Sequence, residues 1–151
     1  MERGTSPVIG IVLLVAITVI AATTVGLAVS TTPPSPTPTA TFDLSVDASS
    51  QQISITHERG DSIDLSEIDL QIKIEGENLE HQPPVPFFAA TGFESGPTGV
   101  FNTASSDQWQ VGQTASITVA ATNDPQIESG DTVTVLLLTE QGVIAEVKTT
   151  A

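Results

Sequence analysis

The chain has 151 residues, of which 39% are hydrophobic, and its 18 acidic residues against four Lys and Arg give a net charge of −14. It contains no cysteine, which excludes disulfides, thiolate catalysis, zinc–thiolate sites and iron–sulfur clusters. A surface this acidic repels the phosphates of nucleic acids and the headgroups of anionic lipids, so we expect no nucleic-acid partner.

The charges divide the chain into two parts. No Asp, Glu, Lys, Arg or His occurs from Thr5 to Phe42, whereas 17 acidic residues and only three basic ones follow from Asp43 onward. The charged part is long enough for one modest core. Salt at about 1 M shortens the Debye length to ~3 Å and screens self-repulsion, so we interpret this acidity, with so few lysines, as halophilic adaptation. The alternative is an ordinary soluble acidic protein.

The uncharged part contains an apolar run of 23 residues without a charge, from Pro7 to Val29, interrupted only by threonines at 18, 23 and 24. As a helix it reaches ~35 Å, enough to span a bilayer, with Ser6 as a suitable N-cap and Pro7 at the first helical position. It is too long to be buried in so small a domain, so it spans lipid or packs with copies of itself. The residues expected to form this helix surface are Ser6, Pro7, Val8, Ile9, Ile11, Val12, Leu13, Leu14, Val15, Ile17, Val19, Ile20, Val25, Leu27 and Val29.

Charged residues stand directly before this segment. A secretory signal has its cleavage site after the apolar stretch, whereas here Glu2 and Arg3 precede it, followed by Gly4 and Thr5. The stretch ERGTSPVIGIVLLVAITVI resembles the N-terminus of archaeal type IV pilins, particularly those of haloarchaea. The resemblance implies that a prepilin peptidase cleaves between Gly4 and Thr5, so that Arg3, Gly4 and Thr5 form the processing site. Residues 1–4 are then a class III signal leader that is removed. Residues 5–30 stay at the start of the mature chain as a hydrophobic helix that spans the membrane and later forms the filament core.

A proline-rich stretch follows the helix. Residues 30–41, STTPPSPTPTAT, contain four prolines among Ser and Thr and no large apolar side chain. This composition favours extended polyproline II, a semi-rigid spacer. We therefore expect a linker over residues 31–41, whose hydroxyl groups are compatible with O-linked sugar.

From residue 42 onward apolar residues alternate with polar ones, as in half-buried strands. The runs are bounded by Gly, Asp, Asn, Ser or Pro and include no convincing helix, which predicts an antiparallel β-sandwich over residues 42–151. The fold class is thus α+β, a pilin-like "lollipop" with a long helix and an all-β head. The alternating runs are Phe42–Val46, Ile53–Ile55, Ile68–Ile74, Ala115–Val119, Val133–Leu137 and Val143–Lys148.

An excursion from Pro83 to Phe101, with at most one short strand, interrupts this pattern. Its aromatic residues are predicted to seal one end of the core rather than to form an exposed binding patch. Trp109 is predicted to be an aromatic residue at the edge of the core, and His57 to close a strand and hydrogen-bond in the following turn. The aromatic residues of the excursion are Phe87, Phe88, Phe93 and Phe101.

Four carboxylates within nine residues, Asp61, Asp64, Glu67 and Asp69, are the best candidate for a metal site. They lack the spacing of a calcium loop, so we interpret them as solvated surface groups. Neither His57 nor His81 has the partners of a catalytic triad, and no phosphate-binding loop or dinucleotide fingerprint occurs. We expect no enzymatic activity, no catalytic residue, no cofactor and no metal.

The body stretches ITHERGDSIDLSEIDLQI, GPTGVFNTASSDQWQVGQTASITV and IESGDTVTVLLLTEQGVIAEV also resemble haloarchaeal pilins, more loosely. The resemblance implies a structural subunit that is membrane-inserted before assembly and then polymerises with copies of itself into an extracellular surface filament for adhesion and cell–cell contact. It implies a prepilin peptidase, an assembly ATPase and a membrane platform as partners. Two alternatives stay open: a monomeric, single-pass, membrane-anchored extracellular binding domain, and a minor pilin or pseudopilin that primes other filaments.

Overall fold

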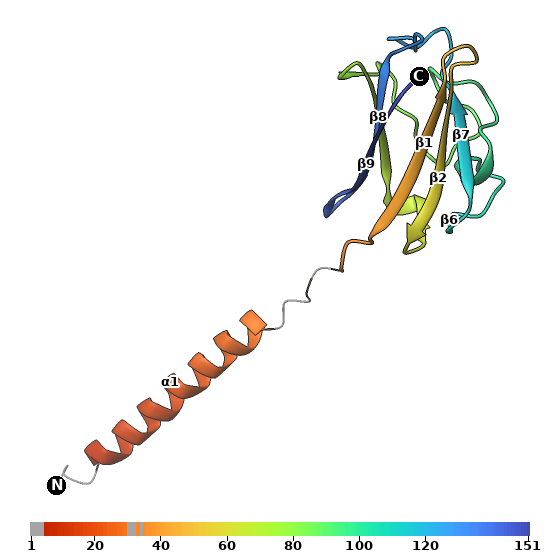
Figure 1. The fold of residues 1–151 in the computed structure, drawn as a ribbon. Coiled ribbons are helices and arrows are strands. Elements are labelled where there is room, and N and C mark those ends of the chain that lie inside the picture. The colour runs from red at the N-terminus through yellow and green to blue at the C-terminus, as the bar shows by residue number, and fades with distance from the viewer. Residues whose placement is uncertain (1–4, 30–32, 34) are drawn as a thin grey trace. The chain divides into compact units, whose positions relative to one another are not determined.

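The structure, a computed structural model, describes residues 5–29, 33 and 35–151. The chain divides into two compact units, Met1–Pro36 and Thr37–Ala151. The first contains the helix α1 and the second contains all the strands, which we call the head (Figure 1).

The helix α1 runs from Thr5 to Val29 without interruption. It starts two residues earlier than the predicted first position, Pro7. The early start is compatible with proline because the first four N–H groups of a helix have no intrahelical acceptor, so Pro7 loses no bond there. The apolar segment therefore forms one continuous helix.

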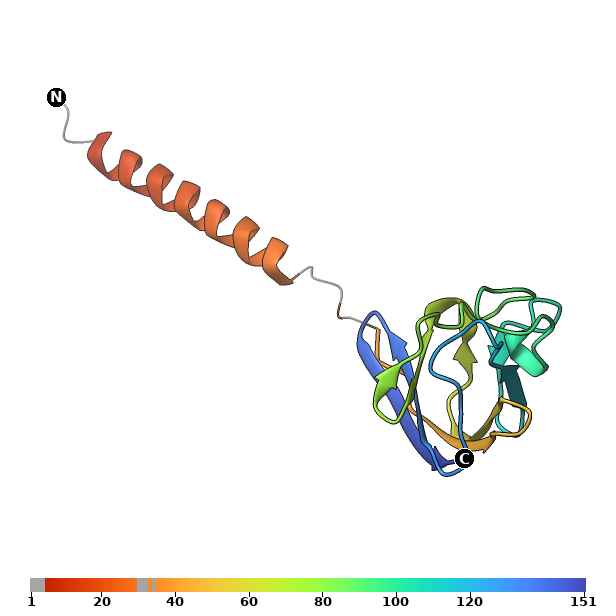
Figure 2. The same ribbon diagram turned by 90° about the horizontal axis from the view of Figure 1, so that it is seen from above.

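The head has two antiparallel sheets, which Figures 1 and 2 show as separate layers. The three-stranded sheet has the order β1-β2-β7, with β1 at Ala40–Asp47, β2 at Gln52–Gly60 and β7 at Thr114–Thr118. The predicted β-sandwich is confirmed, and together with α1 it gives the expected α+β class.

The four-stranded sheet has the order β5-β4-β8-β9. Its strands are β4 at Asp69–Ile74, β5 at Glu77–Asn78, β8 at Thr132–Thr139 and β9 at Gly142–Thr150. Three small features complete the head: the pair of β3 (Ile63–Asp64) with β6 (Gln108–Trp109), and the 3₁₀ helices η2 (Leu65–Glu67) and η3 (Gly99–Phe101).

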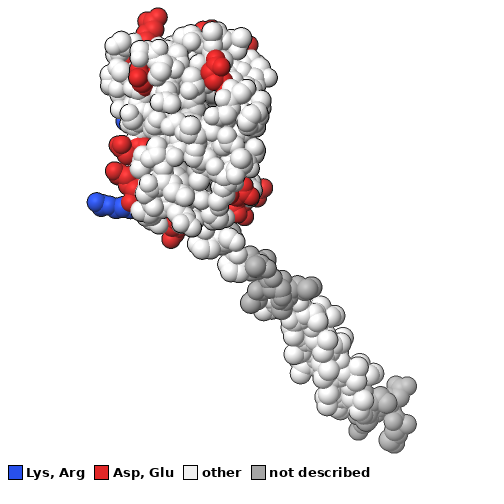
Figure 3. Space-filling view, turned by 90° about the vertical axis from the view of Figure 1, so that its right-hand side faces the viewer, with Lys and Arg blue, Asp and Glu red and all other residues white. Residues whose placement is uncertain are grey.

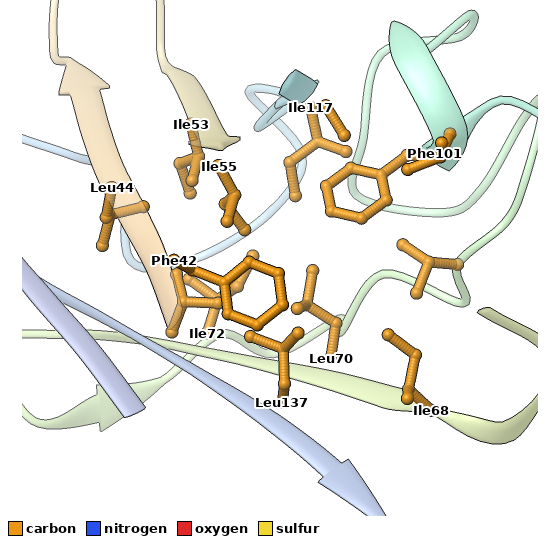
Figure 4. Packing of buried hydrophobic residues seen from close by; sticks show 14 of the residues in the cluster. Phe42, Leu44, Ile53, Ile55, Ile68, Leu70, Ile72, Phe101, Ile117 and Leu137 are labelled. Atoms are coloured by element: carbon orange, nitrogen blue, oxygen red, sulfur yellow. The ribbon is translucent and has the colours of Figure 1, made fainter. Parts of the chain in front are cut away.

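The core lies between the two sheets (Figure 4). Alternate residues of each strand point inward, as the period of two predicts. Among the described residues, every buried hydrophobic residue lies between Ala40 and Leu137, so the head completes its core without α1 and we expect it to fold without the helix. The inward-facing residues labelled from the two sheets are Phe42, Leu44, Ile53, Ile55, Ile117, Leu70, Ile72 and Leu137.

His57 does not close a strand, as the sequence suggested, because β2 continues to Gly60. Its side chain is fully buried and stacks on Phe42, with ring centroids 4.9 Å apart. The ring nitrogens lie 3.1 Å from the carbonyl oxygens of Trp109 and Arg59. Whichever ring nitrogen carries the proton therefore has a carbonyl acceptor, and His57 serves as an inward-facing core residue.

Trp109 is also more deeply placed than the predicted core-edge position. It is fully buried, its indole nitrogen donates to the Gln113 carbonyl over 3.0 Å, and its ring centroid lies 5.1 Å from that of Phe101. The hydrogen bond to Gln113 satisfies the one polar atom that burial would otherwise leave unpaired.

The excursion at Pro83–Phe101 forms isolated bridges and η3 rather than a strand. Phe87, Phe93 and Phe101 are buried, which agrees with their predicted sealing role. Phe88 contradicts the prediction, because its side chain is 61% exposed. Consecutive residues of an extended chain point to opposite sides, so Phe87 and Phe88 cannot both face the core.

Side-chain amides fix the excursion to the sheets. Gln82 accepts a bond from the Ile72 N–H over 2.7 Å and donates to the Ile72 carbonyl over 3.0 Å, so it substitutes for a neighbouring strand along part of β4. The buried Asn123 donates to the carbonyls of His81 and Gly92. These bonds satisfy backbone groups that an open sheet edge would expose.

The last residues of the predicted linker belong to the head. Ala40 and Thr41 lie in β1, and Thr39 exchanges two bonds with Asp61: the Asp61 N–H donates to the Thr39 carbonyl over 2.9 Å, and the Thr39 N–H donates to the Asp61 carboxylate over 3.0 Å. Gly60 makes this contact possible, because a β-carbon there would collide with the Thr39 carbonyl oxygen. We call this contact the linker clasp.

The burial pattern predicts how two identical substitutions differ. Val135→Ala in the fully buried centre of β8 removes two methyl groups and leaves a cavity, so we expect the free energy of unfolding to fall by about 2 kcal/mol. Val143→Ala, at a side chain that is 52% exposed, should change it by less than about 0.5 kcal/mol. Urea unfolding of residues 37–151 measures both, and equal losses would contradict the assignment of the core.

Candidate filament-forming helix

The helix α1 is apolar on every side. A helix of a soluble domain shows one apolar stripe and one polar face. In α1 the five consecutive residues from Ile11 to Val15 are all large and aliphatic, and five residues cover more than one full turn. The helix therefore has no face suited to water.

The apolar side chains of α1 contact little else within this unit. Eleven large aliphatic residues between Val8 and Val25 are 56% to 66% exposed. Covering their remaining exposed surface stabilises the helix by on the order of 10–20 kcal/mol, as an upper estimate. This is comparable with the whole stability of a small domain, so the helix requires an apolar environment.

The threonines of α1 do not make it polar. The Thr18 hydroxyl donates to the Leu14 carbonyl over 2.7 Å, and the Thr23 hydroxyl donates to the Ile20 carbonyl over 2.8 Å. Thr24 donates to the Ala21 carbonyl over 2.9 Å. Because these hydroxyls are satisfied inside the helix, they need no water when α1 is surrounded by apolar groups.

The length of α1 also suits a membrane. From Ser6 to Val25 the helix has a mean hydropathy of 2.8 and is long and apolar enough to cross a bilayer. Lipid tails and neighbouring apolar helices are both environments that such a surface accepts.

The predicted helix-surface residues from Ser6 to Val25 all lie on α1 and are exposed. Thr5, Leu27 and Val29 belong to α1, but their side chains lie outside the described part of the structure. Arg3 and Gly4 also lie outside the described residues. The processing site at Arg3, Gly4 and Thr5 thus stays a prediction.

Residues 3–42 match the family model for the archaeal type IV pilin N-terminal region. Over these residues the chain is similar to the N-terminal region of archaeal type IV pilins. The match begins at Arg3, includes all of α1 and ends at Phe42, so it supports a pilin subunit with a structural role and a membrane-anchored or extracellular location. Of the head it includes only residues 37–42, and no curated protein matches the chain.

Of the four carboxylates that the sequence singled out, Asp61 and Asp64 have separate structural partners. Asp61 belongs to the linker clasp and Asp64 caps η2, while Glu67 and Asp69 are exposed. Within the described residues, no group of three or more His, Asp and Glu side chains is arranged to hold a metal ion.

A hollow of about 500 Å³ lies beside the Gln82 side chain on the head. Asp69 is the one titratable residue among those that line it, so it offers no pair of groups for acid–base chemistry. The remaining lining residues are Leu70, Gln71, Pro83, Pro84, Leu138 and Thr139.

Two surface carboxylates have a pKa below the ordinary value. Ser66 donates to Asp64 from its hydroxyl over 2.6 Å and from its N–H over 2.9 Å, and these bonds lower the pKa of Asp64 below 3.8. Equivalent bonds from Ser49 lower the pKa of Asp47. Such a group contributes stability above its unfolded pKa, and the contribution disappears as the pH falls through the folded pKa.

Replacing Asp64 should therefore have a pH-dependent effect. We expect Asp64→Ala to lower the urea midpoint of the head at pH 7, and the difference from wild type to shrink as the pH falls below 3.8. Ser66→Ala removes the hydroxyl donor but keeps the N–H. Its urea midpoint at pH 7 should lie between those of wild type and Asp64→Ala. A midpoint difference that is constant from pH 7 to pH 2 would contradict the role of the ionised carboxylate.

Proposed function

We propose that the protein is a filament-forming subunit of an archaeal type IV pilus. In this proposal the helix α1 packs with the helices of other copies in the filament core, and the head, residues 37–151, lies on the outside. The observation that carries the proposal is a helix without a polar face joined to a head that completes its core without it. The family match over residues 3–42 supports the same conclusion.

The energetics favour storage in lipid followed by assembly. Water is excluded as an environment for α1 by the exposed aliphatic surface. Transfer from lipid to a bundle of similar helices has little hydrophobic driving force in either direction, because both environments are apolar. An assembly ATPase and a membrane platform would supply the work of moving the subunit out of the membrane.

We further propose that prepilin peptidase removes residues 1–4. Uncleaved, Glu2 and Arg3 would stand at the end of an otherwise uncharged helix, and burying such charges in a filament core is costly without partners. Cleavage between Gly4 and Thr5 leaves no charged side chain before Asp43, so only the new N-terminal amine is charged. The proline-rich residues before Thr37 then separate the core helix from the acidic head.

The acidic head suits an extracellular position in a salty medium, where its self-repulsion is screened. In the proposed function the subunit is membrane-inserted before assembly and extracellular afterwards, in a filament that serves adhesion and cell–cell contact.

The processing proposal predicts the mass of the native chain. Mass spectrometry of protein from sheared surface filaments should find Thr5 as the first residue. Gly4→Leu should block cleavage, whereas Gly10→Ala should be cleaved normally, because a β-carbon at Gly10 meets no other atom within 4 Å. A cellular chain that retains Met1 or Glu2 and forms no filament would favour the membrane-anchored binding domain instead.

The assembly proposal predicts different effects of the same new charge at two exposed aliphatic positions. Leu13→Asp places a carboxylate in the middle of α1, which costs about 2.5–3.5 kcal/mol in an apolar environment, so filaments should be lost. Val143→Asp adds the same charge to the head and should leave filaments unchanged. Electron microscopy measures the filaments, and membrane fractionation separates failed insertion from failed assembly.

If Leu13→Asp subunits insert and still form normal filaments, the helix is not the core. If wild-type subunits occur only as rare components of filaments built from another protein, the chain is a minor pilin.

A further inference from the structure

The charge of the head is unevenly distributed. The 42 residues from Gln82 to Asn123 contain only two charged side chains, Glu94 and Asp107. The remaining 15 acidic residues of the head and all three of its basic residues lie in residues 43–81 and 124–151. One continuous third of the head is thus almost uncharged on an otherwise strongly acidic domain.

Part of this segment, β7 together with residues 93–98, forms one edge of the three-stranded sheet. The chain at residues 93–98 runs beside β7: the Glu94 N–H donates to the Thr118 carbonyl over 2.9 Å, and Thr98 exchanges backbone bonds with Ser116. Figure 3 shows this side of the head, with most of its Asp and Glu side chains near the margins and a broad uncharged area between them. We call the outward side of β7 and of Ser54 and Thr56 in β2, together with residues 87–106, the neutral face. The exposed Glu58 and Arg59 of β2 lie outside it.

The polar groups at the centre of the neutral face are already paired. The Ser54 and Ser116 hydroxyl oxygens lie 2.8 Å apart, and the Thr56 and Thr114 hydroxyl oxygens also lie 2.8 Å apart. A hydroxyl group with a partner loses less free energy when water is removed than an unpaired one. This part of the face can therefore be covered at low cost.

The excursion supplies an apolar anchor. Of the five phenylalanines in the chain, Phe42, Phe87, Phe93 and Phe101 are buried, and Phe88 is 61% exposed. Exposed aromatic side chains contribute strongly where two proteins meet, because they bury a large apolar area and lose little conformational freedom.

We propose that the neutral face binds the same face of a second copy of this chain. Two heads of net charge −14 repel each other in most orientations. When the neutral faces meet about a two-fold axis, most of the carboxylates of both copies point away from the contact. This isologous arrangement is the one in which both partners present their least charged surface.

The symmetry of this contact determines whether it joins subunits of the same filament or of two different filaments. Subunits within one helical filament repeat head to tail, so their contacts are heterologous, whereas a two-fold contact joins molecules that face each other. The neutral face therefore links the heads of two neighbouring filaments and bundles them. This last step rests on the proposed function, but the pairing of heads does not.

The dependence of the affinity on salt distinguishes this contact from an interface held by ion pairs. Higher salt screens the repulsion between acidic heads and takes nothing from a contact made by hydroxyl, methyl and aromatic groups. The affinity between heads should therefore rise with salt, whereas an interface held by ion pairs weakens as salt is added.

The test uses residues 37–151, which complete their own core. Sedimentation equilibrium at about 3 M KCl should show dimers and no larger species, because a two-fold contact closes on itself. At about 0.1 M KCl the same sample should be monomeric, because the Debye length of about 10 Å leaves the repulsion unscreened. Monomers at both salt concentrations, open-ended association or stronger pairing at low salt would overturn the proposal.

Two threonines give a matched pair of charge variants. Thr98→Asp places a carboxylate on the neutral face, where two copies meet across the axis, and should weaken pairing at least about tenfold. Thr150→Asp adds the same charge to an exposed position of β9 and should change pairing less than about twofold. Thr98 precedes η3 and its side chain makes no cap bond, so Asp removes no such bond.

A second pair tests the anchor. Phe88→Ala should weaken pairing, whereas Val143→Ala, at an aliphatic residue of β9 that is 52% exposed, should not. Equal effects within either pair would overturn the assignment of the neutral face.

Electron microscopy connects the pairing of heads to filaments. Thr98→Asp filaments should remain single at a salt concentration where wild-type filaments bundle. If the helix forms no filament, the proposed function fails while the pairing of heads is still measured in solution. If filaments form but their heads do not pair, only the neutral-face proposal fails.

Discussion

The incompatibility of α1 with water is the constraint on which the rest of the molecule depends. A helix with aliphatic side chains on every side must always be covered, first by lipid and, in the proposed function, later by other copies. This constraint explains why the sequence has no charge from Thr5 to Phe42 and why the threonine hydroxyls donate to the helix backbone. It also explains why the head must be complete without the helix, since in the proposed function the two units occupy different environments.

The surface of the head, in contrast, is suited to water, and it carries the same charge as the heads of other copies. Its carboxylates are spread over most of its surface, and some also stabilise turns, as Asp64 does at η2. Their scarcity between Gln82 and Asn123 is visible in the sequence, but its meaning depends on the fold. Only the pairing of β7 with β2 and with residues 93–98 shows that part of this segment gathers at one edge of a sheet.

Most of the fold could be predicted from local pattern, because a period of two in apolar residues determines which side of a strand faces the core. His57 shows the limit of that approach: it continues the series of Ile53 and Ile55, and the period alone would have placed it inside, but its polar side chain suggested a turn. The contacts of Gln82 with Ile72 and of Asn123 with His81 had no local signal, since they join residues 10 and 42 positions apart. The helix surface followed directly from composition, whereas the processing site depends on a family resemblance and not on any geometric pattern.

The linker clasp has a mechanical consequence. Any tension carried by the proline-rich segment enters the head at Thr39, next to its bonds with Asp61, and passes directly into β1. That strand is paired with β2 along its whole length, from Ala40 opposite Gly60 to Asp47 opposite Gln52. A pull along the axis of β1 loads these bonds in shear, all together, rather than peeling them apart one at a time. The tether thus joins the head at the end of a strand whose bonds to β2 share the load.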